Sequence, residues 1–398
     1  MPGRKRLDQV DAIRPIKQAG VVATHVLIYF APAWGNTASN ATLLLLHVCR
    51  ETFFFVSACM LTYGYMDLRR TGLRRFYWRR FVSVGIPYLC WNLIYLLWGM
   101  RGSSYPSVSA AIARYGHLLA VGYYQLYFLI VIMQFYLVYP LVLALLKRTR
   151  GHHGLVIAVA AVAQLAMCIM THWHLLLPPV LINWAQEDSL EYVLFLIGGA
   201  VIAFHFEEVD RWVRANASLV VALTLLATIF AEAVYYLGKA GVTTVLGSGN
   251  DPFQPSVIPF NIGATACVYL AGVALVRPGR SRWVKAAVHS GVENSYGVYL
   301  SQMLFITLLN DHGWRNLSEV ISWPLVIVMT VVIVYACAVM LTSLLARTPL
   351  AVPLTGRKQV PWSTLIPRQW RAEPTAPIEP RLRQPAALAG TADNKNGT

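Results

Sequence analysis

Residues 322–346 read SWPLVIVMTVVIVYACAVMLTSLLA, a run without a single charged side chain. An α-helix needs about 20 apolar residues to cross the roughly 30 Å of hydrocarbon in a bilayer. Comparable runs recur along the chain, which predicts an all-α, polytopic bundle of about ten transmembrane helices. Their expected limits are 12–32, 42–66, 81–99, 124–146, 154–172, 190–206, 217–238, 258–276, 294–310 and 322–346.

Composition points to lipid rather than water as the main surroundings of the chain. Of the 398 residues, 57% are hydrophobic and only 13% are charged, whereas soluble proteins carry about a quarter charged residues. In a soluble protein, the net charge of +15 would suggest nucleic acid as a partner. Here the positive residues gather mainly between the apolar runs, so we expect membrane lipids and no nucleic acid as partners.

The connecting segments alternate in positive charge, which predicts the orientation of the chain. By the positive-inside rule the basic segments face the cytoplasm, and an even number of helices places both termini there. We therefore expect a multi-pass protein of the plasma membrane. The opposite loops hold only Arg101, Arg114, Lys239 and Arg315. The basic segments hold Arg4, Lys5 and Arg6; Arg69, Arg70, Arg74, Arg75, Arg79 and Arg80; Lys147, Arg148 and Arg150; Arg211 and Arg214; and Arg277, Arg280, Arg282 and Lys285.

A polar, proline-rich segment follows the last apolar run. Its composition cannot bury a core, so we expect a transmembrane domain over 1–346 and a disordered cytoplasmic tail over 347–398. The first apolar run is not expected to be a cleaved signal peptide, because polar residues such as Arg14 and Lys17 interrupt it. No metal site is expected, because each of the six cysteines lies alone in an apolar stretch, at positions 49, 59, 90, 168, 267 and 337.

Three polar side chains inside the first two apolar runs are the candidate catalytic residues. Arg14 and His25 share nearly one helical face, about 16 Å apart along the axis. Glu51 lies at about the depth of His25 in the next helix, so a pair of the two is expected. Two structural alternatives stay open: a neighbouring hydroxyl can satisfy His25, and Arg50 or His47 can neutralise Glu51.

The same residues carry a resemblance to the acyltransferase-3 family of membrane acyltransferases. Arg14 and His25 form the Arg-x10-His pattern of that family in the first helix, and the similarity spans about 7–346. The other matching segments are Glu51-Thr-Phe-Phe-Phe-Val-Ser57, Arg79-Arg80 with Pro87-Tyr88 and Trp91, and Ser295-Tyr-Gly-Val-Tyr-Leu300. The chain departs from the family pattern at Ala58, Cys59, Ser83 and Gln302.

The resemblance implies an O-acyltransferase that moves an acyl group, commonly acetyl, from cytoplasmic acyl-CoA to a hydroxyl of a carbohydrate or related acceptor. Acyl-CoA is then a donor substrate, and no bound cofactor is expected. Arg14, Arg79 and Arg80 are the expected contacts of the anionic nucleotide. The alternative is that the arginines of this segment, Arg74 and Arg75 included, are ordinary positive-inside anchors.

The expected mechanism makes His25 the general base toward the acceptor hydroxyl, with Glu51 orienting the imidazole and Arg14 opening the path from the cytoplasm. Transfer can be direct or pass through an acyl-enzyme. Trp91, Asn92, Tyr296, Tyr299 and Gln302 are the expected substrate-binding residues, although each can equally serve helix packing. Glu232 is a second intramembrane acid without an assigned role.

Two rival classes stay open. A transporter would relay protons or bind a substrate without making a covalent bond, and would use His25, Glu51, Arg50 and Glu232. A non-catalytic membrane component of polysaccharide assembly stays open because of the departures at Ala58, Ser83 and Gln302. The sequence gives neither the acyl chain, nor the acceptor, nor the oligomeric state.

Overall fold

The computed structural model describes residues 7–31, 36–101, 107–176, 178, 182–249 and 251–365. Within these ranges the chain is helical, and the only β-type pairing is an isolated bridge between Thr244 and Gly247. Each of the ten expected segments contains a helix. The prediction of an all-α membrane bundle is therefore confirmed.

The first half of the chain builds the centre and one side of the bundle. Its helices are α1 (Asp8–Asp11), α2 (Ile13–Phe30), α3 (Thr37–Leu46), α4 (Val48–Tyr65), α5 (Leu68–Thr71), α6 (Leu73–Arg80), a π-turn (Phe81–Gly85), α7 (Ile86–Gly99), α8 (Val108–Val121), a 3-10 turn (Tyr124–Leu126), α9 (Tyr127–Arg148) and α10 (His153–His172).

The second half completes the bundle. After two 3-10 turns (Ala185–Glu187 and Ser189–Tyr192) come α12 (Val193–Ile202), α13 (Phe206–Ala215), α14 (Ala217–Lys239), α15 (Val257–Leu275), α16 (Arg282–Asp311), a 3-10 turn (Trp314–Glu319), α17 (Trp323–Leu345) and α18 (Ala351–Thr355), with a last 3-10 turn at Trp362–Leu365.

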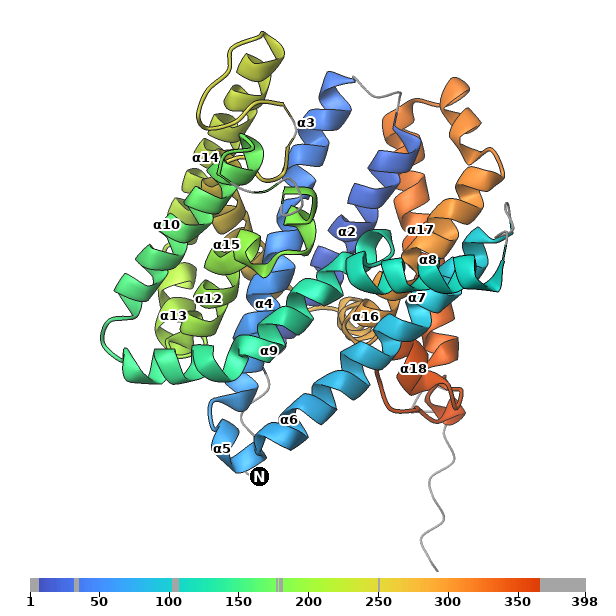
Figure 1. The fold of residues 1–398 in the computed structure, drawn as a ribbon, viewed down its shortest axis with the longest axis horizontal. Helices are drawn as coiled ribbons and strands as arrows, with labels where there is room; N and C mark the ends of the chain where they lie inside the picture. The colour runs from blue at the N-terminus through green and yellow to red at the C-terminus, as the bar shows by residue number, and fades with distance from the viewer. Residues whose placement is uncertain are drawn as a thin grey trace, which may run out of the picture. The chain divides into compact units, whose positions relative to one another are not determined.

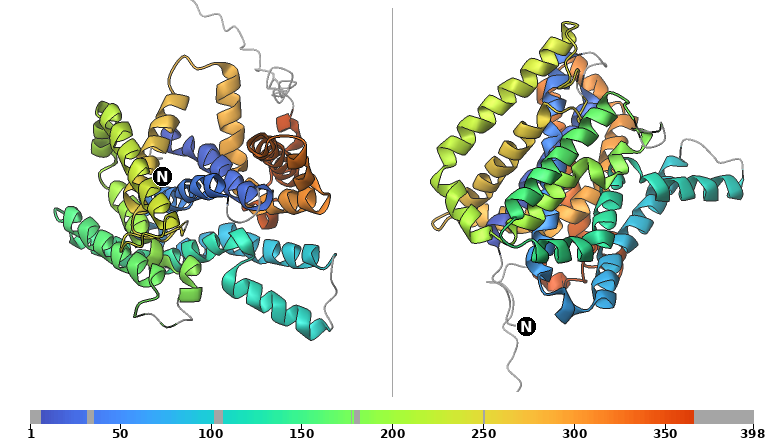
Figure 2. Two further views of the ribbon diagram at one scale, coloured as in Figure 1. Left: turned by 90° about the horizontal axis from the view of Figure 1, so that it is seen from above. Right: turned by 60° about the vertical axis from the view of Figure 1, so that its left-hand side comes forward.

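Helices α2 and α4 lie in the middle of the bundle, and two groups of helices flank them (Figure 1). On one side α12 packs along α4 and α10 packs on α12, while α15 also packs on α4 and α14 packs on α15. On the other side α16 and α17 pack against α2. Helices α7 and α8 form an antiparallel pair at the edge, which the view from above shows clearly (Figure 2). The helix with the candidate residues Arg14 and His25 is thus enclosed by protein.

Large apolar side chains cover the outside of the flanking helices. Leu137 and Leu141 on α9 are 70% and 74% exposed, and Val162 on α10 is 68% exposed. An exposed apolar surface of this extent is typical of helices that face lipid.

Seven helices of the described residues are long and apolar enough to cross a membrane, or eight if the pair formed by residues 189–202 and α13, bent by 102°, is one span. The expected count of ten is higher because it included α2 and α16. These two helices carry the polar residues of the candidate site, which lowers their mean hydropathy.

The C-terminal boundary differs from the expected one. The helical unit extends to Gln359 rather than ending at residue 346. Helix α18 packs against α7, where the Trp91 indole N–H donates to the Leu354 carbonyl at 2.9 Å. Backbone carbonyls beyond the last apolar run thus find buried donors, which a count of apolar residues cannot reveal. Residues 366–398, also part of the expected tail, lie outside the described residues.

Candidate active site

His25 is a buried histidine whose two ring nitrogens have no hydrogen-bond partner among the described residues. Its side chain is only 7% exposed, and its ring lies 5.2 Å from the ring of Tyr124. It lines a cavity of about 320 Å³, called the His25 cavity below. An imidazole that lacks a protein partner but borders open space can meet a substrate there.

The His25 cavity lies between α2, α4, the start of α9 and the 3-10 turn at Ala185–Glu187. Apolar groups form part of its wall, and several side chains offer polar atoms. These polar residues are Thr24, His47, Arg50, Tyr124, Tyr127, Gln186 and Glu187. No group of three or more potential metal ligands occurs in the described part of the chain.

The wall beside His25 is formed by an unusual backbone segment. Gly122 has φ +77°, and a Cβ added there would lie 2.5 Å from the backbone nitrogen of Tyr127. Tyr124 has φ +36°, a conformation that non-glycine residues rarely adopt and that costs about 1–3 kcal/mol. Asn92 fixes this segment, because its Oδ1 accepts a hydrogen bond from the Tyr123 N–H at 2.9 Å. Asn92, predicted as a substrate contact, therefore positions the wall instead.

The predicted pair of His25 and Glu51 is absent. Glu51 instead accepts hydrogen bonds from the Arg50 guanidinium, at 2.6 Å from Nη2 and 3.0 Å from Nε. Arg50 is 4% exposed and lies over the rings of Tyr192 and Phe253. A buried guanidinium requires a compensating charge, and the adjacent carboxylate provides it. The interpretation of Glu51 as the residue that orients His25 is therefore replaced by the structural alternative.

Arg14 lines a second cavity of about 160 Å³, called the Arg14 cavity below. Lys17 borders the same space, with its ammonium 3.8 Å from the ring centre of Phe53. Gln18 and Tyr296 also line this cavity. Among the described residues, neither the Nε2 atom of Gln18 nor the hydroxyl of Tyr296 has a hydrogen-bond partner. The Arg14 cavity thus combines two basic side chains with two unsatisfied polar groups. One cation is partly neutralised, because Asp11 lies 3.1 Å from Arg14.

Aromatic rings lie between the two cavities. Phe53, in the wall of the Arg14 cavity, packs edge-on at 5.7 Å against Phe128, in the wall of the His25 cavity. Phe53 also stacks on Tyr299, whose hydroxyl donates to the Gln125 carbonyl at 2.6 Å. We call Phe53, Phe128 and Tyr299 the aromatic partition.

Tyr296 and Tyr299 lie at the Arg14 cavity and not beside His25. They were predicted to line the path of the acceptor, but the face of α16 that carries them packs at the depth of Arg14. Gln302 is fully buried, lines neither cavity, and has no hydrogen-bond partner for its amide among the residues described. Trp91 binds α18, as described above. The predicted substrate-binding set is therefore not brought together at His25.

Arg79 and Arg80 do not line the Arg14 cavity. Arg80 donates to the Tyr65 hydroxyl at 2.8 Å and lies over the rings of Tyr65 and Tyr136. Arg79 is exposed. Arg80 therefore links α6 to α4 and α9, and of the three arginines predicted to bind the donor only Arg14 borders a cavity.

Sequence reasoning missed Lys17, Tyr124 and Glu187 as residues of the site. Lys17 follows Arg14 by three positions, so helical spacing already placed both on one face. Tyr124 lies in the short turn before α9, and Glu187 lies in a turn before α12. In such connecting segments no helical periodicity indicates which way a side chain points.

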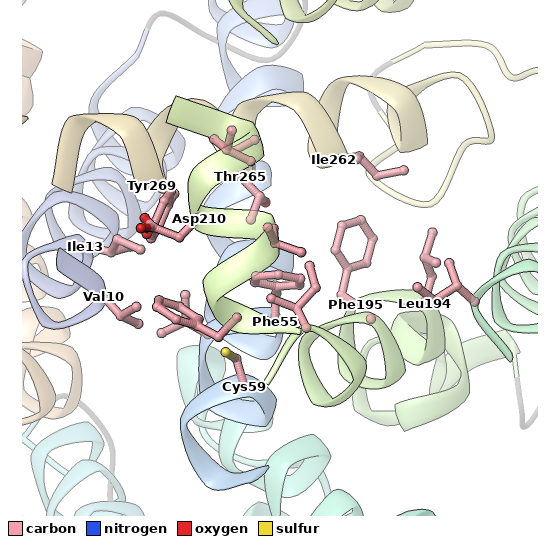
Figure 3. Close-up of a pocket in the computed structure, with 18 residues that line it drawn as sticks. Val10, Ile13, Phe55, Cys59, Leu194, Phe195, Asp210, Ile262, Thr265 and Tyr269 are labelled. Atoms are coloured by element: carbon pink, nitrogen blue, oxygen red, sulfur yellow. The ribbon is translucent and has the colours of Figure 1, made fainter. Parts of the chain in front are cut away.

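A third cavity, of about 250 Å³, shares Val56 with the wall of the Arg14 cavity and is almost entirely apolar. Figure 3 shows its wall, with Val10 and Ile13 on one side, Phe55 and Phe195 in the middle, and the oxygens of Asp210 and Tyr269 meeting at one end. These oxygens are hydrogen-bonded to each other. The Asp210 carboxylate in this wall is held by Tyr269 and by Arg214, and the Cys59 thiol is buried.

The comparison with known proteins gives one match. A family model described as an acyltransferase domain matches residues 7–341, which is most of the chain. The chain belongs to the acyltransferase-3 family. Neither a search of curated proteins nor a search of solved structures gives a match. With its helices exposed to lipid, the chain is a membrane acyltransferase.

Proposed function

We propose that this acyltransferase moves an acyl group, in the first instance acetyl, from cytoplasmic acyl-CoA to a hydroxyl of a carbohydrate or related acceptor. The observation that carries the proposal is the arrangement of α2. One face of this helix offers Arg14 and Lys17 to one cavity, and His25 with its unpartnered ring nitrogens to another.

The Arg14 cavity supports binding of the donor. The nucleotide of acyl-CoA carries several negative charges, which Arg14 and Lys17 can balance. Its flexible arm contains amide groups, which suit the unsatisfied polar atoms of Gln18 and Tyr296. Arg79 stays a candidate contact for the nucleotide because its guanidinium is exposed. With the basic segments on the cytoplasmic side of the plasma membrane, the Arg14 end of α2 faces the compartment that holds acyl-CoA.

The chemistry proposed for the His25 cavity is acyl transfer. An acceptor hydroxyl gives its proton to His25 while its oxygen attacks the thioester carbonyl. The carbon–sulfur bond then breaks, an ester forms, and the proton on His25 passes to the departing CoA thiolate. His25 serves this role because imidazole takes and releases a proton near neutral pH.

The test is transfer of label from radioactive acetyl-CoA to an envelope glycan extract by the purified protein. We expect a labelled product with the wild type and at least a hundred-fold less with His25→Ala, since general base catalysis contributes about 10²–10⁴. His152→Ala is the matched control, because His152 is exposed at the start of α10. No labelled product from the wild type, or equal product from His25→Ala, would refute the proposal and favour a transporter or a non-catalytic component.

A further inference from the structure

Glu187 presents a carboxylate to the same cavity as His25. Among the described residues, no side chain forms a hydrogen bond or ion pair with this carboxylate. Glu187 lies in the 3-10 turn before α12, and its side chain is only partly exposed. Partial burial raises the pKa of Glu187, because the carboxylate has lost water without gaining a side-chain donor. A ligand that donates hydrogen bonds would compensate this loss.

The backbone that carries Glu187 is held firmly. Gln134 on α9 donates from Nε2 to the Glu187 carbonyl at 2.8 Å, and its Oε1 accepts from the Ser189 N–H at 2.9 Å. The Tyr192 hydroxyl donates to the Gln186 carbonyl at 3.1 Å. The segment is therefore fixed by the half-buried Gln134 and the buried Tyr192, and the Glu187 side chain is presented from a defined position.

Tyr124 supplies the second element of this site. The residue is 41% exposed, its ring borders the cavity beside His25, and its strained backbone is held by Gly122 and Asn92 as described above. Strain of this kind is retained where a side chain must be held in a set direction. The cavity wall thus offers a flat aromatic face, a carboxylate and an imidazole.

We propose that Tyr124 and Glu187 form a subsite for a sugar ring that delivers one ring hydroxyl to His25. The C–H face of a sugar ring packs on the Tyr124 ring, and its neighbouring hydroxyls donate to the Glu187 carboxylate, which only accepts hydrogen bonds. This rests on the proposed function and deepens it, because it names the residues that select a polyhydroxylated ring. A cationic acceptor is the competing occupant, because it would also pair with the Glu187 carboxylate, and the experiment below separates the two.

The first experiment measures binding without catalysis. Saturation-transfer NMR with purified protein would use glucose, galactose, N-acetylglucosamine and rhamnose as probes, with choline as the cationic comparison. At least one sugar is expected to bind the wild type. Glu187→Gln and Tyr124→Ala should each raise the dissociation constant roughly tenfold or more, because hydrogen bonds to a charged group are lost in one and a stacking surface in the other. Tyr124→Phe should retain binding.

Glu207→Gln is the matched control, since Glu207 is exposed on α13 and borders no cavity described here. In a transfer assay with the sugar that binds, Glu187→Gln should raise the KM for the sugar more than the KM for acetyl-CoA. The subsite is overturned if no sugar of the panel binds the wild type, if choline binds in place of sugars, or if Glu187→Gln leaves binding unchanged. Sugar binding that Glu187→Gln weakens, without any acetyl transfer by the wild type, would support the subsite and refute the proposed function alone.

Discussion

Removal of the Glu51 charge should destabilise the whole helical unit, because Arg50 would stay buried without a counter-ion. The two side chains are 4% and 5% exposed, and breaking such a buried pair costs about 3–5 kcal/mol. The helical unit has 359 residues. At about 2.1 cal/mol/K per residue, its unfolding entropy is about 0.75 kcal/mol/K. Glu51→Gln should therefore lower the thermal unfolding midpoint by about 4–7 °C.

The assay is thermal unfolding of purified protein in detergent, followed by intrinsic fluorescence. The double variant Arg50→Met with Glu51→Gln should unfold at a higher temperature than Glu51→Gln alone, because it leaves no buried charge without a partner. The ion pair of Arg70 and Asp67 provides the control. It has the same nitrogen-to-oxygen distance of 2.6 Å, but its side chains are 83% and 53% exposed. Asp67→Asn should change the midpoint by about 1 °C or less.

The reasoning would be refuted if Glu51→Gln unfolded at the wild-type temperature, or if the double variant were less stable than Glu51→Gln. Arg50 Nη2 also donates to the Pro252 carbonyl at 3.2 Å, and the first result would mean that this carbonyl and the surrounding rings satisfy the Arg50 charge alone. The second would mean that Arg50 stabilises the bundle independently of Glu51.

Two more changes test segments that contribute to the wall of the His25 cavity, one at Gly122 and one at Asp251, which precedes the lining residue Pro252. Gly122→Ala should be clearly more destabilising than Gly151→Ala, because both glycines have positive φ but only the added Cβ at residue 122 meets backbone, at 2.5 Å; equal midpoints for the two variants would show that the segment before Tyr124 adapts. Asp251→Asn should flatten the pH dependence of stability between about pH 5 and pH 3. Burial alone would raise the pKa of Asp251, but the hydrogen bond from His172 and that from the Phe253 N–H outweigh it, so the folded pKa lies below the ordinary value. Ionised Asp251 thus stabilises the fold at pH values above its unfolded pKa, and this stabilisation is lost as the pH falls through the folded pKa. If Asp251→Asn lost stability in acid as steeply as the wild type, the assignment would be contradicted.

The helices could be predicted from the sequence because lipid requires long apolar runs, and each run contains a helix. The first and last residues of the helices were harder to predict from the sequence. Helix α16 begins at Arg282 rather than at 294, because its first turns carry charged residues that the apolar run excludes. The bend between α12 and α13 lies inside an expected span, where no proline indicates it.

The candidate site could be predicted only where it follows one helix. The spacing of Arg14 and His25 on one face requires nothing beyond helical geometry, and each residue borders a cavity. The prediction that His25 is the partner of Glu51 was wrong, because equal depth in the membrane does not determine the direction in which a side chain leaves its helix. The positions of Tyr124 and Glu187 depend on how distant segments pack, which a single sequence does not encode in any local pattern.

The aromatic partition has a consequence for the membrane potential of the cell. In the proposed orientation the Arg14 and His25 cavities open toward opposite compartments, so a continuous water column between them would let protons leak and discharge the membrane potential. The packed rings of Phe53, Phe128 and Tyr299 stand where such a column would run. Under the proposed function, the acyl group would have to pass this partition while the barrier to ions stays intact.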